Sequence, residues 1–460
     1  MESHKNTSFM AHFLKGEAVS AFWGFSTKGV GLLNTFLTIT SLTLYQYGVF
    51  QLLLSVAGLS SDFLNIGGGV VSNEISRAVG EKREADAKRI FIEYTIVRII
   101  IAIALWAGVF FGAEIFFRSY SQDFINDTRI ISFLFITEAI FMIIKTLCLV
   151  KLKFGIVGAR STINKIVQFC ILVYFFAQGN LGLQALIWSV IIASAVSVAA
   201  VLIPFLKVYF DWKNVAVPAQ GLLWDIFKVY GKWDITRQIG NRITSRIKPW
   251  LIKIFIGTEA VAVFSIAEMI VSTLQDILPS KTLQSLVPLW IKDKELSVKM
   301  FSYGVKYFVL LGVILGIGAL IVVPPVVHTF FSKYNSSLPL FYFMIFNLPI
   351  FAAGILIGNY IIAFRKQKFL LFHQMSRNAL TLLIILCTLP FIGLWGLALE
   401  YVFVPLIMAF VTYVYTKRRS PGFHFDTNII FAYKEEDNII LAKAFSIVKS
   451  WPQKAKKLFE

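Results

Sequence analysis

The residues best suited to chemistry in this sequence are six cations that gather in one otherwise apolar stretch. The segment VYGKWDITRQIGNRITSRIKPWLIKIF, residues 229–255, carries these six cations against a single acid, Asp234. At 100° per residue, Arg242, Arg246 and Lys253 fall within about 40° of one another on a helix and form a stripe. Guanidinium forks bind phosphate and carboxylate groups through paired hydrogen bonds, so the pattern favours an anionic ligand.

Other ionisable residues lie singly inside apolar segments, where a charge is costly unless it faces water or a partner. Lys28 lies about ten residues into the first apolar segment, too deep to reach either membrane surface. Arg98 follows Glu93 by five residues, and Lys145 follows Glu138 by seven. Each of these two cations either neutralises the acid before it or faces the same cavity as the arginines.

The excess of buried cations over buried acids predicts a cavity for an anionic cargo. Its candidate binding residues are Lys28, Arg98, Lys145, Arg242 and Arg246. Buried carboxylates are sparse, and we expect the site for a coupling proton or sodium ion among three of them, which are Asp62, Glu138 and Asp276. The three cysteines and five histidines show no metal-ligand spacing, so no metal site is predicted.

The elements that hold these charges are expected to be membrane-spanning helices. Hydrophobic residues make up 57% of the 460 residues and charged residues 15%, with a mean hydropathy of +0.72. Soluble domains carry about a quarter of charged residues. Apolar stretches of roughly 20 residues, long enough to cross a bilayer as helices, recur along the whole chain. They lack the alternation that a membrane barrel requires, so we predict an all-α polytopic membrane protein.

Twelve transmembrane helices are predicted. Their approximate bounds are 18–44, 47–75, 90–117, 130–152, 156–177, 181–205, 227–256, 259–291, 303–328, 339–364, 369–391 and 393–416. Lysine and arginine concentrate in the connections on one side of these spans, and the positive-inside rule places that side, with both termini, in the cytoplasm. This asymmetry, with anionic lipid headgroups, accounts for most of the formal net charge of +18 without a nucleic acid partner.

A weak internal repeat divides the spans into two halves. At an offset of 214 residues YGVF aligns with VAVF, and Lys28 aligns with Arg242. The same offset brings a glycine run beside a proline, so the second helix of each half is weakened at a similar depth. The predicted hinge residues are Gly67, Gly68, Gly69 and Pro279.

We therefore predict two pseudo-symmetric six-helix bundles related by an axis along the membrane normal. The predicted parts are a cytoplasmic N-terminus at 1–17, an N-terminal bundle at 18–205, a cytoplasmic linker at 206–226, a C-terminal bundle at 227–416 and a cytoplasmic tail at 417–460. The tail mixes apolar residues with lysines, and we interpret it either as an amphipathic helix on the membrane surface or as a disordered segment.

This combination resembles the polysaccharide flippases of the MOP superfamily, the Wzx-type O-antigen flippases and related translocases. The features that carry the resemblance are the two six-span halves, the early YGVF, the Gly-rich second span ending in NEISRAVGEKREADAKRIF, and the cations inside the first and seventh spans. It implies a MOP/MATE-like fold in the bacterial inner membrane. It also implies an activity: turning an oligosaccharide linked to polyprenyl (undecaprenyl) diphosphate, such as an O-antigen repeat unit of lipopolysaccharide, from the cytoplasmic to the periplasmic leaflet.

The resemblance further implies partners and leaves two alternatives. The cationic residues would meet the diphosphate, and polysaccharide polymerase machinery would act beside the flippase. A multidrug or cation-coupled exporter of the same superfamily would share the helices but is expected to use acidic residues. A membrane glycosyltransferase or polymerase would handle the same sugars, yet no long external loop and no GxSxG, P-loop or HExxH spacing occurs. We expect a transporter without catalytic residues or cofactor, coupled to a proton or sodium gradient.

Overall fold

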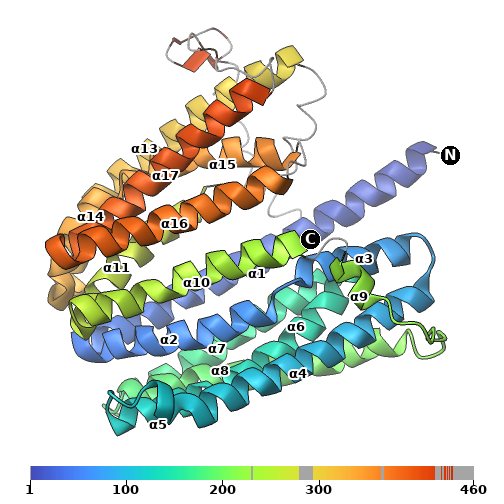
Figure 1. The fold of residues 1–460 in the computed structure, drawn as a ribbon, viewed down its shortest axis with the longest axis horizontal. Helices are drawn as coiled ribbons and strands as arrows, with labels where there is room; N and C mark the ends of the chain where they lie inside the picture. Colours follow the sequence, from blue (N-terminus) through green and yellow to red (C-terminus); the bar gives the residue numbers. More distant parts are fainter. Residues whose placement is uncertain are drawn as a thin grey trace. The chain divides into compact units, whose positions relative to one another are not determined.

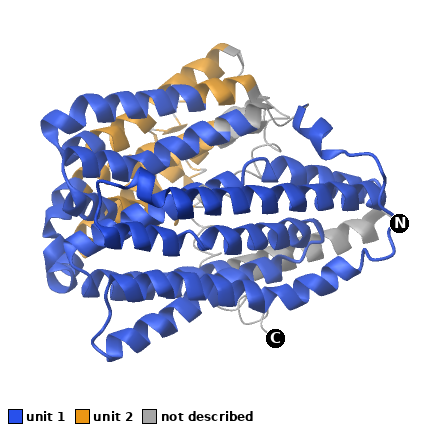
Figure 2. Cartoon of the chain, turned by 60° about the horizontal axis from the view of Figure 1, so that its bottom comes forward, with its two compact units in different colours: residues 1–267, 325–340, 374–397 blue, residues 268–324, 341–373, 398–460 orange. Residues whose placement is uncertain are grey.

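The structure is a computed structural model that describes residues 2–228, 232–278, 294–363 and 367–419, with isolated positions between 426 and 438. Every regular element in that part of the chain is a helix. The chain divides into two compact units (Figure 2). Unit 1 comprises residues 1–267, 325–340 and 374–397, and unit 2 comprises residues 268–324, 341–373 and 398–460.

Most of unit 1 is formed by the first part of the chain (Figure 1). Its helices begin with α1 (Glu2–Ser41), α2 (Leu44–Leu64), α3 (Gly68–Gly80), α4 (Glu84–Phe116), α5 (Gln122–Ile131) and α6 (Leu134–Val150). They continue with α7 (Phe154–Ala177), α8 (Leu183–Phe210), the short α9 (Leu223–Ile226), α10 (Lys232–Phe255) and the first part of α11 (Thr258–Gln275). A capping box starts α2, because Thr43 and Gln46 each accept a hydrogen bond from the other's backbone N–H.

The later helices are α13 (Lys294–Phe330), the 3₁₀ helix η2 (Ser332–Ser337), α14 (Leu338–Met344), α15 (Asn347–Ala363), α16 (Gln367–Ile392) and α17 (Leu394–Arg419). Within unit 2, Gly312 of α13 allows the backbone of α15 to approach closely, since a Cβ there would lie 3.1 Å from atoms of Leu348 and Pro349. The buried Asp437 accepts hydrogen bonds from Lys306 Nζ, at 2.8 Å, and from the Tyr307 hydroxyl. The amphipathic helix that we considered for the tail falls mostly outside the described residues.

Each of the twelve predicted spans coincides with at least one described helix. By length and composition, nine described helices could cross a membrane, or ten if the bent pair Ser332–Met344 and Asn347–Gly358 forms one span. The prediction of an all-α polytopic membrane protein is confirmed, whereas the bounds of the two six-helix bundles stay a prediction. Neither α1 nor α10 is among those nine helices, and these two carry Lys28 and Arg242.

A glycine turn separates α2 from α3. Gly67 has a φ of +71°, in the left-handed region that residues with a Cβ rarely adopt. A Cβ at this position would also lie 2.6 Å from the ring of Phe227. The predicted hinge glycines, Gly67, Gly68 and Gly69, therefore lie at a real interruption of the helix. Hinge motion there stays a prediction, and Pro279 lies outside the described residues.

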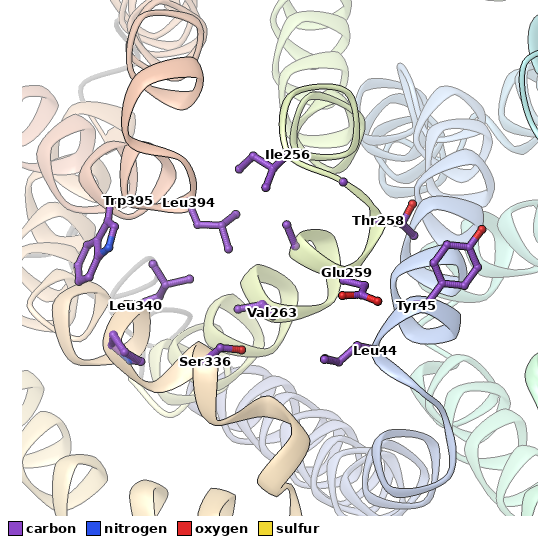
Figure 3. A pocket seen from close by; sticks show the side chains of 13 residues that line it. Leu44, Tyr45, Ile256, Thr258, Glu259, Val263, Ser336, Leu340, Leu394 and Trp395 are labelled. Atoms are coloured by element: carbon purple, nitrogen blue, oxygen red, sulfur yellow. The ribbon is translucent and has the colours of Figure 1, made fainter.

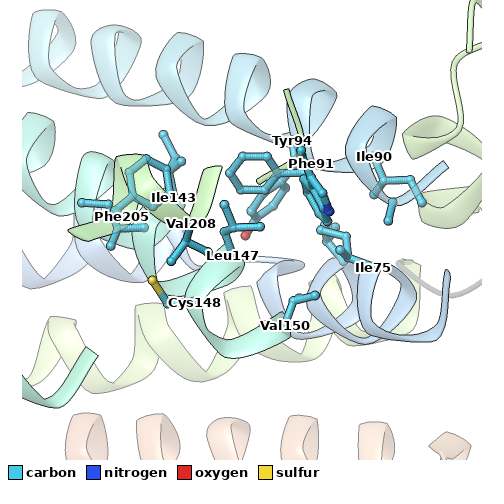
Figure 4. Close-up of a cluster of buried hydrophobic side chains, with 14 of the residues drawn as sticks. Ile75, Ile90, Phe91, Tyr94, Ile143, Leu147, Cys148, Val150, Phe205 and Val208 are labelled. Carbon is cyan, nitrogen blue, oxygen red and sulfur yellow. The ribbon is translucent and has the colours of Figure 1, made fainter. Parts of the chain in front are cut away.

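The apolar core of unit 1 lies where α3, α4, α6 and α8 meet (Figure 4). Ile75, Phe91, Leu147 and Phe205 come from these four helices and are all buried. Such packing holds side chains in defined positions, so the charged residues of α4 and α6 lie on rigid helices. The core therefore positions the polar groups that lie beside it.

Candidate anion-binding site

Helix α10 packs against α2 (Figure 1), and its contacts run in the antiparallel order. Near the C-terminal end of α10, the indole Nε1 of Trp250 donates a hydrogen bond to Ser55 Oγ over 2.7 Å. A Cβ at Gly48, one end of α2, would collide with the backbone of Thr258, just beyond α10. This register brings the earlier, arginine-bearing turns of α10 to the last turns of α2.

Two arginines of α10 share one carboxylate of α2. Asp62 Oδ2 accepts a hydrogen bond from Arg246 Nε over 2.9 Å, and Asp62 Oδ1 lies 3.4 Å from Arg242 Nη1. Arg242 also donates to the backbone oxygen of Asp62 and, through Nη2, to Gln238 Oε1 over 2.9 Å. Asp62 is thus the interhelical partner of two predicted binding residues. The three side chains together keep one positive charge.

The predicted cation stripe divides in the structure. Arg246 lies along α2, where a Cβ at Gly58 would collide with its guanidinium. Lys253 instead lies over the ring of Tyr120, with Nζ 3.7 Å from the ring centroid. The side chain of Arg237 is outside the described part of the chain. Arg242 and Arg246 therefore form the arginine pair that α10 contributes.

Arg98 of α4 is 2% exposed and lies beside the start of α3. Its guanidinium donates to the Tyr94 hydroxyl and lies 4.4 Å from the centroid of that ring, while its Nη1 has no hydrogen-bond partner among the described residues. Of the two alternatives that the sequence left open for Arg98, the structure does not show the pairing with Glu93, which accepts from Arg89 Nε over 2.6 Å and from backbone amides at the start of α9. A carboxylate that binds one helix start and a neighbouring arginine is not available to Arg98.

Glu138 of α6 pairs with Arg160 of α7, a residue that the charge pattern assigned to a cytoplasmic connection. Arg160 also donates to Ser194 Oγ over 3.2 Å and lies 4.1 Å from the centroid of Phe141. The sequence left open a pairing of Glu138 with Lys145, but the ion pair that the structure shows for Glu138 is with Arg160. The position of Arg160 inside the predicted span 156–177 was the signal that could have revealed it.

Lys145 and Lys165 add positive charge beside this pair. Lys145 of α6 interacts electrostatically with Arg98, Arg160 and Glu138, and it makes no ion pair within the described ranges. Lys165 of α7 was not among the residues predicted from the sequence. It donates a hydrogen bond to Gln168 Oε1 over 3.3 Å and is repelled electrostatically by Arg160. Neither lysine is neutralised locally, so both raise the positive potential inside unit 1.

These interactions join into one continuous set of groups, which we call the cationic network. Arg98 and Arg242 lie close enough to repel each other, and this interaction links the α10 arginines to α4 and α6. The network comprises Arg98, Lys145, Arg160, Lys165, Arg242 and Arg246 with the acids Asp62 and Glu138. It brings together four of the five predicted binding residues and two of the three predicted coupling carboxylates.

Two predicted site residues lie elsewhere. Lys28 is exposed on α1, and its neighbour Thr27 hydrogen bonds to Thr162 of α7 over 2.8 Å. Asp276 is exposed in the turn after α11 and belongs to unit 2. Both residues make further interactions.

A cavity of about 740 Å³ lies in unit 1 at the other end of α10 (Figure 3). Tyr45, Glu259 and Trp395 line it together with aliphatic side chains such as Leu340, and its lining holds no lysine or arginine. On the α10 side, the first residue that lines the cavity is Ile256. At a helical rise of 1.5 Å per residue, Ile256 lies about 20 Å from Arg242. This cavity is therefore not the anion site.

The family comparison places these features in context. The family model described as polysaccharide biosynthesis protein matches residues 13–294, a range that contains the whole cationic network. The chain belongs to the polysaccharide biosynthesis protein family. No curated protein matches the sequence.

Solved structures show which fold this family member adopts. An inward-facing multidrug resistance MATE transporter of the MOP superfamily is 13% identical, with 88% of this chain and 97% of that chain covered at a TM-score of 0.70. A variant of the Vibrio cholerae MATE transporter VcmN is 14% identical, with 92% and 99% covered at 0.58. A MOP superfamily transporter from Pyrococcus furiosus, with a binding pocket of reverse polarity, is 13% identical, with 89% and 94% covered at 0.55.

These fold neighbours are transporters, and the chain shares their fold. The chain is therefore a polytopic helical membrane protein of the polysaccharide biosynthesis protein family with a MATE-like fold. The MOP/MATE-like fold that the resemblance implied is confirmed. The identity of the cargo is a separate question, because one fold can carry unrelated sites.

Proposed function

We propose that the protein is a flippase for oligosaccharides linked to polyprenyl (undecaprenyl) diphosphate, the repeat units of O-antigen or another surface polysaccharide. It acts in the bacterial inner membrane with both termini in the cytoplasm and delivers its product to polysaccharide polymerase machinery. The anionic diphosphate binds the cationic network, and the polyprenyl tail remains in the lipid.

The observation that carries this proposal is the unneutralised positive charge around Arg98. Its guanidinium is buried with one nitrogen unpartnered, and the nearby Lys145 makes no ion pair within the described ranges. A charged side chain inside a membrane protein is retained when it serves a function, because its insertion costs on the order of 3 kcal/mol. A diphosphate supplies the missing acceptors and the missing negative charge.

The start of α3 offers further support. Its N-cap Gly67 has no side chain to cap the first amides of that helix, and Arg98 lies against Gly68. The first amides of a helix have no acceptor within it and favour an anion. Amides and guanidinium groups on rigid helices are suited to a phosphate group.

Transport then requires the network to face each side of the membrane in turn. The glycine turn between α2 and α3 is the proposed hinge, and a proton or sodium gradient is the proposed driving force. Of the candidate coupling carboxylates, Asp62 and Glu138 are already paired with arginines, whereas Asp276 is exposed. Release of the cargo requires a lower affinity in one state than in the other.

A multidrug exporter is the alternative within the same superfamily. The fold does not decide between the two, since fold neighbours include multidrug transporters and one transporter of reverse pocket polarity. The charge of the site favours the flippase, because a cationic drug would be repelled by a network with six cations and two acids.

The test is complementation in bacteria that lack their own flippase for O-antigen or another surface polysaccharide. The wild-type chain is expected to restore surface polysaccharide in a strain with a matching glycan. Arg242→Ala is expected to abolish rescue and Arg242→Lys to retain part of it, at equal protein levels in the membrane. Arg118→Ala, which removes an exposed arginine of the same unit, is the control. Undiminished rescue by Arg242→Ala, or drug efflux without any rescue, would contradict the proposal.

A further inference from the structure

Asp62 occupies the positions that a substrate anion would take on the two α10 arginines. One carboxylate oxygen accepts from Arg246 Nε at 2.9 Å, and the other faces Arg242 Nη1 at 3.4 Å. Carboxylate and phosphate oxygens present similar acceptors to guanidinium groups. An anion can therefore take these donors only if Asp62 gives them up.

The contacts of Asp62 with Arg242 and Arg246 are partly exposed to solvent. The side chains of Arg242, Asp62 and Arg246 are 16%, 25% and 37% exposed. By contrast, the Lys306–Asp437 pair of unit 2 has a carboxylate with 0% exposure. A ligand from solvent can thus approach the Asp62 contacts without first opening a packed core.

Asp62 also lies at the end of its helix, beside the turn to α3. It belongs to the last turn of α2, which ends at Leu64, directly before the turn that includes Gly67. The last turn of a helix lacks part of its backbone hydrogen bonding and frays more readily than the interior. The guanidinium of Arg246, in contrast, lies along α2 at Gly58. The carboxylate is the member of the trio best placed to withdraw.

We propose that Asp62 is an internal counter-anion that holds Arg242 and Arg246 in the empty transporter and is displaced by the diphosphate of the cargo. The inference rests on the proposed function and adds to it how the site is regulated. Because Asp62 competes with the cargo for the two arginines, it lowers their affinity for the cargo. When the cargo leaves, the Asp62 carboxylate binds the arginines again, which favours release. The displaced carboxylate is released beside the α2–α3 turn, which couples occupancy of the site to the proposed hinge.

The first experiment measures binding of inorganic pyrophosphate to the purified full-length protein by titration calorimetry. Asp62→Asn removes the competing charge and is expected to tighten binding about tenfold. Asp62→Glu keeps the charge and is expected to stay within about threefold of wild type. Glu114→Gln, which removes the carboxylate from an exposed pair with Arg129, is the matched control and should change nothing.

The outcomes separate the inference from the proposed function. Weaker or unchanged pyrophosphate binding by Asp62→Asn, with binding intact in wild type, would show that Asp62 only positions the arginines. That result would overturn the inference and leave the flippase proposal standing. Absence of binding of both pyrophosphate and undecaprenyl diphosphate to the wild type would overturn both.

A second measurement uses the wild-type protein and does not depend on the folding of a variant. A carbodiimide with a labelled amine modifies accessible carboxyl groups, and mass spectrometry reads the extent of labelling at Asp62. Pyrophosphate is expected to increase labelling at Asp62 several-fold and to leave Glu114 unchanged. Constant or reduced labelling of Asp62 at saturating pyrophosphate would overturn the inference.

Discussion

Two acid–arginine sites in unit 1 use the same chemical groups in different proportions. Glu138 faces one arginine, Arg160, and the pair is charge-balanced and held by Ser194 and Phe141. Asp62 faces two arginines, Arg242 and Arg246, and leaves a net positive charge. The balanced pair joins α6 to α7 and has no unmet charge, whereas the unbalanced trio can accept a further anion. Stoichiometry, more than residue type, distinguishes a structural pair from a binding site.

Removing the acid from the balanced pair is expected to have the largest effect. Glu138→Gln leaves Arg160 buried without a counter-charge and should destabilise the protein by on the order of 3 kcal/mol. The measurement is the apparent melting temperature of the detergent-solubilised protein. Replacing both partners, as Glu138→Gln with Arg160→Met, should recover most of the loss, because Arg160 is then no longer left as a buried charge without its carboxylate. If Glu138→Gln alone were as stable as wild type, the Glu138–Arg160 pair would not have the structural role assigned to it.

Removing Arg98 is expected to affect binding rather than stability. Arg98→Ala should weaken pyrophosphate binding about 10- to 100-fold, as loss of a charge-assisted hydrogen bond of roughly 1.5–3 kcal/mol implies. Its melting temperature should not fall as that of Glu138→Gln does, because an unpaired buried charge is removed. Arg118→Ala is the exposed control. A large loss of stability with unchanged affinity would make Arg98 a structural residue and contradict its assignment to the site.

The substitution Gly58→Ala is expected to have the smallest effect, a change in the affinity for pyrophosphate. In Gly58→Ala the new methyl group would lie 2.3 Å from the guanidinium carbon of Arg246, so that side chain has to shift, and we expect its contact with Asp62 to loosen. Asp62 then holds mainly Arg242, so the proposed counter-anion competes less well, and pyrophosphate binding should tighten about threefold. Gly108→Ala in α4, where a Cβ would meet nothing within 4 Å, is the control.

The double variant Gly58→Ala with Asp62→Asn tests whether the effect of Gly58→Ala on binding acts through Asp62. If the Gly58 effect acts through Asp62, Gly58→Ala should have no further effect in the Asp62→Asn background. Weaker binding by Gly58→Ala in the wild-type background would mean that the anion needs Arg246 in its place along α2. That result would contradict the proposed competition.

Several features of the fold were predictable from the sequence alone. The apolar runs specified a helical membrane protein, and each predicted span contains described helix. The stretch 229–255, which carries Arg242, stood out as cationic within an apolar chain, and the glycine run at 67–69 marked a real helix interruption. These features depend on composition and spacing within single segments, which is the information that hydropathy and helix propensity read.

The pairing of charges was decided only by the tertiary structure. The sequence suggested partners nearby in the chain, such as Glu93 for Arg98, yet Asp62 and Arg242 meet across 180 residues. Arg160 displaced Lys145 as the partner of Glu138, because α7 presents its guanidinium to α6 while Lys145 extends from α6 itself. Which carboxylate meets which cation depends on helix neighbours, their register and the depth at which they cross. A single helical segment contains none of these quantities, since they arise when helices pack.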